Sequence, residues 1–177
     1  NKLIICSTGE APYIYTQTGN IALLGGTPPN GKFCRVHLGR LWIAGVSSAK
    51  YRLYYSQAFD PEQWTTGAGY LDIDPDDGSK DGITAIFPSF QGDLIVAKVD
   101  KLYKIVGFTP NTYKIVPITK NVGCVAHNSV AAVQNDLIFA SERGITSLQT
   151  AQNIKGDIQS TFLSSAIHDL FQKINRT

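Results

Sequence analysis

The stretch Gly39-Arg40-Leu41-Trp42-Ile43-Ala44-Gly45 is a short apolar run that opens on a turn pair and closes on a glycine. Immediately before it, Phe33–His37 alternates in side-chain character with the period of two that is typical of a half-buried β-strand. Two such runs joined by a turn of two or three residues indicate a β-hairpin. We therefore expect a hairpin of an antiparallel sheet at this point of the chain.

The same phrase returns along the chain as a turn residue, a charged residue, a leucine and two large apolar residues. It recurs at Asn1–Ile5, Gly92–Val96 and Asn135–Phe139. The anchoring leucines are Leu3, Leu41, Leu94 and Leu137. Their spacing of roughly 40 to 50 residues lies in the range of β-propeller blades. This internal repeat predicts an all-β fold.

Short apolar runs between turn signals are the expected strands of four repeats. They are Leu3–Cys6, Tyr13–Tyr15 and Ile21–Leu24; Phe33–His37, Leu41–Ala44, Tyr51–Tyr55 and Tyr70–Ile73; Ile83–Phe87, Leu94–Lys98, Leu102–Val106 and Tyr113–Ile118; and Ser129–Val133, Leu137–Ala140 and Gly144–Leu148. A single sheet of this kind is apolar on both faces, so its stability requires stacking of successive sheets. A β-sandwich also uses short strands, but it lacks the recurring phrase.

We therefore predict propeller-type blades of four antiparallel strands over residues 1–152. About three to four blades form only part of a propeller, which further sequence or another chain would complete. The chain begins at Asn1 and contains no methionine, and we accordingly expect it to belong to a longer protein.

The last segment, residues 153–177, changes in character and predicts a C-terminal amphipathic helix. From Asp157 to Ile174 the apolar residues recur at helical spacing between polar ones. Asp157 or Ser160 is suited to cap the start of this helix. Its apolar stripe requires a protein partner, either the blades or a neighbouring subunit.

Charge and hydropathy exclude some classes of protein. The formal net charge of +2 carries no electrostatic footprint of nucleic-acid binding by itself. No run of eighteen apolar residues occurs, so we predict no membrane-spanning segment.

The three cysteines, Cys6, Cys34 and Cys124, are an odd set without Cys-x-x-Cys spacing. Cys6 and Cys34 fall on expected strands among apolar neighbours, where cysteine serves as a small hydrophobe. We interpret all three as structural, and their use as typical of folding in a reducing compartment.

Five carboxylates are packed into the loop Asp72–Asp81, which suggests a calcium site. An EF-hand loop starting at Asp72 would need glycine where Asp77 stands and glutamate where Ile83 stands. The alternative is a solvated turn between blades, in which Asp, Pro and Gly favour the backbone geometry. We predict that the loop binds no calcium tightly.

No catalytic constellation is found in the sequence. His37, His127 and His168 have no spacing that indicates a shared metal or a triad, and no serine lies in a G-x-S-x-G elbow. Gly25-Gly26 and Gly67-Ala68-Gly69 are interpreted as turns, since no helix and lysine follow them. We therefore assign no catalytic, cofactor-binding or metal-ligating residue, and we predict that the protein is not an enzyme.

Aromatic residues are dense around the second repeat. They are Trp42, Trp64, Tyr51, Tyr54, Tyr55 and Tyr70. Such residues bind sugars or peptides on some surfaces, but in a propeller they more often fill the space between blades. We favour a core role for them.

Several longer phrases resemble sequences of tailed-bacteriophage structural proteins. They are Pro28–Lys32 with Val36–Gly45, Arg52–Ser56 with Asp60–Trp64 and Gly69–Ile73, Gly82–Ile86 with Gly92–Val96, and Gly144-Ile145 with Leu163–Ile167. The set, which covers about residues 1 to 175, is similar to the β-propeller neck and tail proteins of short-tailed phages. These include the tail nozzle (tubular tail) and packaged-DNA stabilisation families.

The resemblance implies a virion structural protein of the tail or neck, assembled in the bacterial cytoplasm. Identical subunits would form a ring that contacts the portal, the adaptor and other tail proteins. Its channel would retain packaged double-stranded DNA and later conduct it, without sequence-specific binding. Strong contacts to a rod with one negative charge per ~1.7 Å would stall ejection, so a subunit near neutrality suits this role.

One alternative from another class stays open. A receptor- or carbohydrate-binding propeller at the tail tip or on a cell surface would use the aromatic group around Trp64. Calcium at Asp72–Asp81 is a further element of this alternative. A eukaryotic-style repeat adaptor is less favoured, because the Gly-His and Trp-Asp signature of such repeats is not found.

Overall fold

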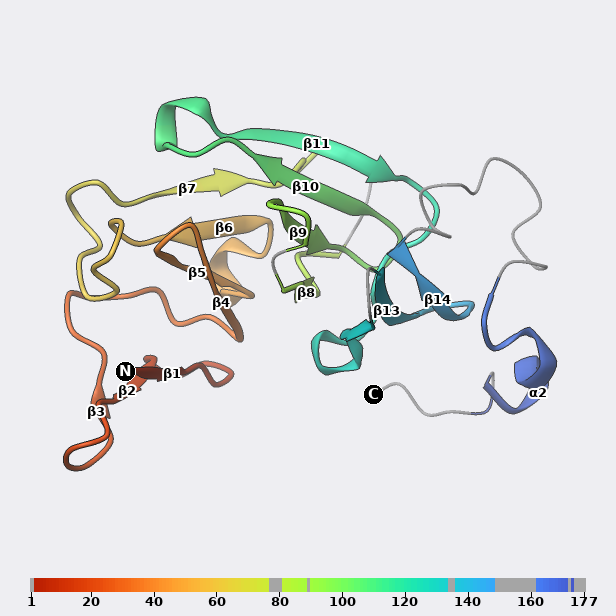
Figure 1. Ribbon diagram of the computed structural model, residues 1–177, viewed down its shortest axis with the longest axis horizontal. Helices are drawn as coiled ribbons and strands as arrows, with labels where there is room; N and C mark the ends of the chain where they lie inside the picture. Colours follow the sequence, from red (N-terminus) through yellow and green to blue (C-terminus); the bar gives the residue numbers. More distant parts are fainter. Residues whose placement is uncertain are drawn as a thin grey trace.

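The computed structural model describes residues 2–76, 81–88, 90–133, 136–148, 162–171 and 173, and this part of the chain is all-β (Figure 1). The strands are β1 (Leu3–Ile5), β2 (Tyr13–Tyr15), β3 (Ala22–Leu23), β4 (Phe33–His37), β5 (Arg40–Ala44), β6 (Arg52–Tyr55), β7 (Gly69–Asp72), β8 (Ala85–Ile86), β9 (Leu94–Ala97), β10 (Leu102–Val106), β11 (Lys114–Thr119), β12 (Ala131–Val133), β13 (Asp136–Ser141) and β14 (Gly144–Ser147). Short helical turns lie at η1 (Ser47–Ala49), η2 (Pro110–Thr112), η3 (His127–Ser129), η5 (Ser165–Ile167) and α2 (His168–Phe171). None of the helices in the described ranges is long and apolar enough to cross a membrane.

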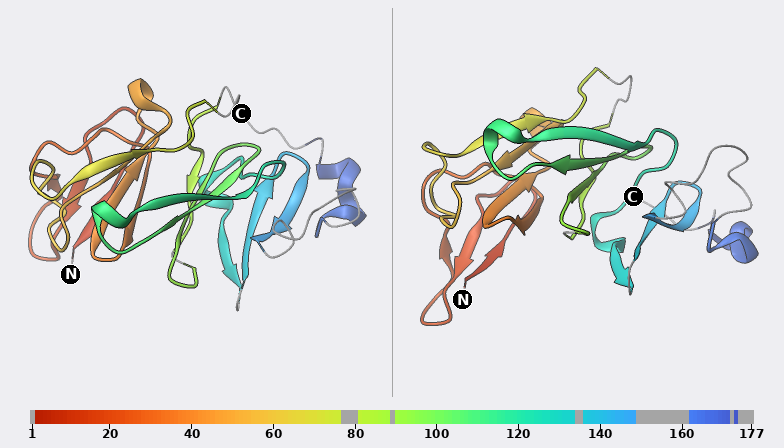
Figure 2. Two further views of the ribbon diagram at one scale, coloured as in Figure 1. Left: turned by 90° about the horizontal axis from the view of Figure 1, so that it is seen from above. Right: turned by 45° about the horizontal axis from the view of Figure 1, so that its top comes forward.

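The strands form four antiparallel sheets that follow one another in chain order. The first sheet is β1-β2-β3, the second β4-β5-β6-β7, the third β8-β9-β10-β11 and the fourth β12-β13-β14. Each sheet is a meander, and the sheets succeed one another along the molecule from the N-terminus onward (Figure 2). The prediction of an all-β chain with four consecutive antiparallel units is confirmed. Within the described residues the sheets do not close into a ring.

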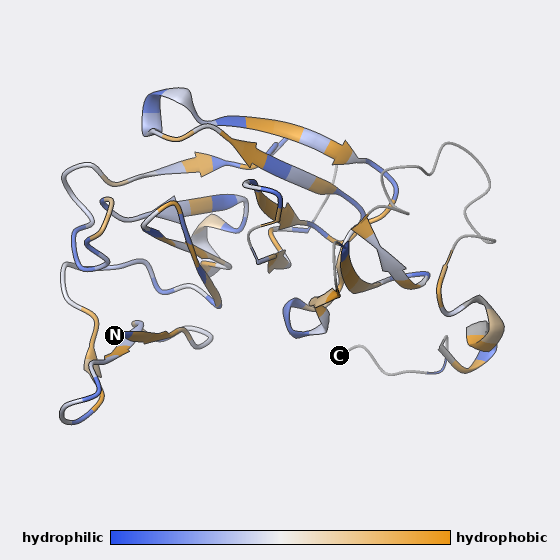
Figure 3. Ribbon diagram, viewed as in Figure 1, coloured by the Kyte–Doolittle hydropathy of each residue, from blue (hydrophilic) through white to orange (hydrophobic). Residues whose placement is uncertain are grey.

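Successive sheets are held together by apolar cores that lie between them. The first core, between the first and second sheets, contains Ile14, Leu24, Leu41 and Ile43. The second core, between the second and third sheets, contains Trp42, Ala44, Leu53, Tyr55, Ile73, Ile83, Ile86, Leu94, Val96, Tyr103 and Ile105. The third core contains Ala85, Phe87, Ile95, Ala97, Leu102, Val122, Cys124, Leu137, Phe139, Leu148 and Phe162. Figure 3 shows the same pattern, with apolar residues concentrated on strands and polar residues in the turns.

The repeated leucines occupy equivalent places in this stack. Leu41, Leu94 and Leu137 lie on the second strands of their sheets and are all buried. Each of the three belongs to the core shared with the preceding sheet. The prediction that they are equivalent buried positions is confirmed. Leu3 differs, since it lies on the face of the first sheet that no other described sheet covers and is 57% exposed.

Alternation along β5 explains how one strand serves two cores. Leu41 and Ile43 point into the first core, whereas Trp42 and Ala44 point into the second. Because successive side chains of a strand project to opposite faces, a strand between two sheets must be apolar throughout. All five residues of β5 are buried, and the four that enter the two cores, Leu41 to Ala44, are apolar.

The turn before β5 lies one residue earlier than the expected pair Gly39-Arg40. Leu38 and Gly39 both have positive φ angles, of 49° and 70°, and His37 pairs with Arg40 across the hairpin. Positive φ at both central residues is the requirement of the tight hairpin turn that matches strand twist. Arg40 belongs to the strand, where its guanidinium donates to the carbonyl oxygens of Ser56 and Gly67 at 2.7 and 2.6 Å.

The expected long helix at Asp157–Ile174 is not found in the described residues of that segment. Residues 157–161, 172 and 174 lie outside the described ranges, and the described helical turns of this segment are η5 and α2. Before them, the backbone N–H of Leu163 donates to the carbonyl oxygen of Ile145 at 2.8 Å, which places Leu163 beside β14. Phe162 is buried in the third core. Pairing of this segment with an open strand edge therefore competes with helix formation. The helical periodicity of the sequence does not reveal such a tertiary contact.

Candidate functional site

A cleft of about 500 Å³ opens where segments of the second, third and fourth sheets come together. Its walls come from the start of β4, the turn after β5, the segment before β8 and the loop before β12. The polar side chains that line it include those of Lys32, Ser47, Lys50, Thr84 and His127. We take this three-sheet cleft as the candidate site, because polar groups from three repeats meet in it.

Two glycines allow the walls of the cleft to approach one another. Gly45 has a φ of 79°, and a Cβ there would lie 3.0 Å from Cβ of Lys32 and 3.1 Å from the ring of Phe33. At Gly82 a Cβ would collide with the backbone oxygen of Lys50. The next residue, Ile83, donates its N–H to that same oxygen at 2.8 Å. Gly82 is therefore required by the close approach of the Lys50 backbone, and Gly45 by its positive φ angle.

His127 is held by neighbours from two other sheets. Its Nδ1 accepts the backbone N–H of Ile86 at 3.3 Å, and its ring lies 4.8 Å from the ring of Phe33. Arg35 completes the junction by donating its Nε–H to the carbonyl oxygen of Ile86 at 3.3 Å. Burial, together with the positive charge of Arg35, lowers the pKa of His127 to about 4. The imidazole is therefore neutral near pH 7 and carries its proton on Nε2.

This geometry limits the chemistry that the cleft supports. The lone pair of Nδ1 is occupied by the Ile86 N–H, so His127 is not placed to act as a general base. Among the described residues that line the cleft are Lys32 and Lys50, and none of these described residues is Asp or Glu. Two cations beside a neutral imidazole are suited to contact with an anion.

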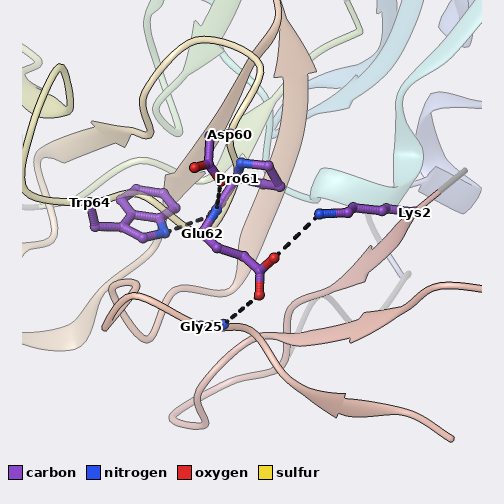
Figure 4. A network of polar contacts seen from close by, with 6 residues as sticks. All are labelled: Lys2, Gly25, Asp60, Pro61, Glu62 and Trp64. Atoms are coloured by element: carbon purple, nitrogen blue, oxygen red, sulfur yellow. Dashed lines mark hydrogen bonds and ion pairs between the residues drawn. The ribbon is translucent and has the colours of Figure 1, made fainter.

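A second group of polar contacts joins the first sheet to the second (Figure 4). Glu62 contacts residues on either side of the first sheet in the sequence. Its Oε2 lies 3.3 Å from Nζ of Lys2, and its Oε1 accepts the N–H of Gly25 at 3.3 Å. Asp60 holds the turn by accepting the N–H of Glu62 at 3.0 Å. At Gly26, where φ is 77°, a Cβ would overlap the backbone oxygen of Glu62. We call this set the Glu62 clamp.

The aromatic group of the second repeat divides between core and surface. Trp42 and Tyr55 lie in the second core with ring centroids 5.1 Å apart, which confirms the core role for these two. Trp64 packs against the first core and donates its Nε1–H to the carbonyl oxygen of Pro61 at 2.8 Å. Tyr70, by contrast, is 51% exposed.

Tyr70 carries a stacked cation on the outer strands of the second sheet. The guanidinium of Arg52 lies 3.7 Å from the centroid of the Tyr70 ring, and the ring of Tyr54 lies 6.1 Å from that of Tyr70. Arg52 also donates to both oxygens of Asp72, at 2.8 and 3.2 Å. We call these residues the Arg52–Tyr70 patch.

In the described part of the loop Asp72–Asp81, the acidic loop, the first carboxylates bind other side chains of the protein. Arg52 binds Asp72 and lowers its pKa. Asp74 accepts the hydroxyl of Tyr103 at its Oδ2, at 3.1 Å. Residues 77–80 lie outside the described ranges. Among the residues described, no three His, Cys, Asp or Glu side chains come together as a metal site.

Lys98 is a buried lysine that the sequence did not single out. Its Nζ donates to the carbonyl oxygen of Asp74 at 2.7 Å and lies 4.7 Å from the ring centroid of Tyr51. The sequence does not reveal that this lysine is buried, because an exposed lysine at the same place in an apolar strand would give the same pattern. The contacts of Lys98 fix the start of the acidic loop against the third sheet.

The cysteines partly fit their expected role as buried hydrophobes. Cys124 is fully buried in the third core. Cys6 and Cys34 are only half-buried and meet against the first core, one from each sheet. A hydrogen bond from the Cys6 thiol and the charge of Arg35 lower the pKa of Cys34 to about 7, and the pKa of Cys6 is raised. Cys6 and Cys34 are 28 positions apart in the sequence, and this spacing did not predict that they would meet.

The three histidines lie on separate elements. His37 ends β4 and is buried, which lowers its pKa, and its carbonyl oxygen accepts Nε1–H of Trp42 at 3.1 Å. His127 lines the three-sheet cleft and His168 begins α2. Comparison with known proteins assigns no role to any of them, since no protein-family model and no curated protein matches the chain.

Proposed function

We propose that this chain is a non-enzymatic structural protein of a tailed-phage virion, and that it forms part of the tail or neck channel. The observation that carries the proposal is the run of repeated sheets with apolar residues exposed at both of its ends. Leu3 and Leu23 are 57% and 61% exposed on the first sheet. At the other end Leu170 is 63% exposed. Exposed apolar groups gathered in this way favour assembly with other protein surfaces.

A propeller-type arrangement is the finer fold that we infer for the assembled protein. The first strands of the second and third sheets, β4 and β8, lie near one another, and Arg35 and His127 both bind Ile86 of β8. Convergence of first strands is expected where blades are arranged radially about an axis. The arc formed by these sheets would be completed by other protein.

The proposed role in conducting DNA draws on the sequence resemblance and on charge. A net charge of +2 over the whole chain gives little attraction to a phosphate backbone. The three-sheet cleft offers two lysines, Lys32 and Lys50, which is enough for a transient phosphate contact but not for a binding groove. These features suit a channel wall that does not retain DNA by adhesion.

Replacing Ile167 and Leu170 with aspartate in the phage tests this function. Both side chains are exposed, at 51% and 63%, so folding of the subunit should be little affected. We expect heads that package DNA but fail to retain it or to complete tails. Phe108→Asp is the matched control, because Phe108 is 79% exposed in the turn after β10, away from both ends. Particles with intact tails and normal DNA retention that fail only to adsorb to the host would contradict the proposal.

The Arg52–Tyr70 patch favours a second candidate function, the binding of a carbohydrate or receptor. An exposed aromatic ring beside hydrogen-bonding groups suits a sugar, because the ring offers an apolar surface and the polar groups can bond to hydroxyls. Tyr70→Ala would abolish glycan binding by the purified protein if this function holds, while Phe108→Asp would not. Absence of binding by the unchanged protein to a broad glycan panel would leave the structural role as the better account.

A further inference from the structure

Two cysteines meet between the first and second sheets, against the core that joins these sheets. Cys6 follows β1, two residues after Ile4, and both side chains pack against the first core. Cys34 lies on β4 opposite Ile43 of β5, and it packs against the same core from the second sheet. The Cys34 thiol also donates to the carbonyl oxygen of Ile4 at 3.9 Å. The two thiols are therefore brought together from residues of different sheets.

The surroundings of these two thiols favour ionisation of only one of them. A hydrogen bond from the Cys6 thiol and the charge of Arg35 lower the pKa of Cys34 to about 7, although burial opposes the shift. The same hydrogen bond, together with burial, raises the pKa of Cys6. Near pH 7 a large part of Cys34 is thus thiolate, whereas Cys6 keeps its proton. A thiolate beside a second thiol is the arrangement in which a sulfenic acid condenses to a disulfide.

Cys124 provides a contrast within the same chain. It is fully buried in the third core, and its thiol donates to the carbonyl oxygen of Ala126 at 3.2 Å. Burial raises the pKa of this thiol. A buried thiol of this kind is inert towards oxidants. The surroundings of Cys6 and Cys34 therefore distinguish them from a cysteine that only fills a core.

We propose that Cys6 and Cys34 are an oxidisable pair that closes to a disulfide in the presence of a peroxide and thereby fastens the first sheet to the second. The Cys34 thiolate displaces hydroxide from hydrogen peroxide and becomes a sulfenic acid, and the hydroxide takes up a proton to form water. The Cys6 sulfur then attacks Sγ of Cys34, and the S–S bond forms. The departing hydroxide leaves as water with the Cys6 proton. Two thiols lose two electrons, and one peroxide is reduced to two molecules of water.

The bond would act at the junction with the smallest apolar core. The first core buries four residues of the described chain, whereas the second buries eleven. A disulfide between Cys6 and Cys34 encloses β2 and β3 and restricts opening of the first sheet. Free thiols suit folding in a reducing compartment, and the bond forms when the protein reaches an oxidising one. This inference goes beyond the proposed function and does not depend on it.

Peptide mapping of the full-length protein without reducing agent tests the bond. After hydrogen peroxide is added to the reduced protein, trypsin should release residues 3–32 joined to residues 33–35, with two hydrogen atoms fewer than the separate peptides. Iodoacetamide should modify Cys34 of the reduced protein ~10-fold faster than Cys124 or more. In Cys6→Ser the sulfenic acid of Cys34 has no partner and should be trapped by dimedone. Cys124→Ser, the matched control, should form the joined peptides like the unchanged chain.

Amide hydrogen exchange on the same samples measures the fastening. Oxidation should slow exchange in β1–β3 by ~10-fold or more and leave exchange in β9 and β10 nearly unchanged. In Cys34→Ser, peroxide should change neither region. Peroxide-treated protein without the joined peptides, or with either cysteine bonded to Cys124, would overturn the pair. Joined peptides without slower exchange in β1–β3 would overturn the role of the bond in fastening the first sheet.

Discussion

The first core and the second core join neighbouring sheets through the same repeat position, but they are built to different strengths. The first core buries four residues of the described chain, whereas the second buries eleven, including Trp42 and Tyr55. Polar contacts of the Glu62 clamp and two half-buried cysteines supplement the first core. The comparison teaches that the second and third sheets supply most of the apolar burial, and that the first sheet is attached to them more weakly.

The weaker attachment has a physical consequence for dynamics. Regions with few buried apolar contacts open more readily than the main core, on their own and without global unfolding. The first sheet is also the sheet whose outer face is uncovered. A partner that covers this face would therefore stabilise the part of the subunit that has the most stability to gain.

The largest expected effect is the loss of a repeat leucine from the second core. Leu94→Ala should lower the free energy of unfolding by ~2–5 kcal/mol, because it leaves a cavity in a tightly packed site. Leu41→Ala in the first core should cost less, since fewer buried neighbours lose contacts there. Urea denaturation of both variants measures the two costs. Equal losses of unfolding free energy in the two variants, or a larger loss in Leu41→Ala, would show that the first core is not the weaker one.

Lowering the pH should reduce the stability of the protein at His127, where the second, third and fourth sheets meet. In the folded protein the pKa of His127 is lowered to about 4 from an ordinary value of 6.5. As the pH falls, His127 is therefore protonated in the unfolded chain before it is protonated in the folded one. The stabilising contribution is complete above pH 6.5 and is lost progressively towards pH 4, by up to ~3 kcal/mol. Urea denaturation at several pH values measures the loss.

His127→Gln supplies the control for this prediction, because glutamine does not titrate and its side-chain oxygen can still accept an N–H. Its stability should fall less between pH 6.5 and 4 than that of the unchanged chain, with the remaining fall including the contribution of His37. A variant that follows the same pH dependence as the unchanged chain would exclude His127 as the source.

The smallest expected effect is that of the Glu62 clamp. Lys2 and Glu62 form an ion pair whose side chains are 47% and 41% exposed, and pairs of this kind contribute ~0.2–1 kcal/mol. Glu62→Gln should therefore barely change global unfolding, yet it should speed amide hydrogen exchange in β1–β3. Exchange that speeds equally in β9 and β10 would mean that the first sheet is not a separate unit of stability.

The sequence predicted the repeats well because their signal is local and periodic. Phe33–His37 and Leu102–Val106 were expected as strands with the bounds that the structure shows. The recurring leucine phrase located the second strands of the second, third and fourth sheets, where Leu41, Leu94 and Leu137 are buried. Local pattern was sufficient wherever the fold repeats itself.

The remaining features depend on contacts between distant residues. Cys6 with Cys34, Lys98 with Asp74, and His127 with Ile86 are pairings that no spacing in the sequence reveals. The apolar pattern near the C-terminus predicted a long helix, whereas Phe162 is buried in the third core and Leu163 pairs with Ile145. Tertiary contacts of this type override an amphipathic pattern when an open strand edge lies nearby.

Electron cryomicroscopy of the assembled full-length protein is the most direct test of the central claim, that repeated sheets stack in series and that further protein continues the stack. We predict that Leu3 and Leu23 are buried there against further protein, either more of the same polypeptide or a neighbouring subunit. The first strands β4, β8 and β12 should lie innermost about a shared axis. A full-length protein in which Leu3 and Leu23 face solvent would contradict the account.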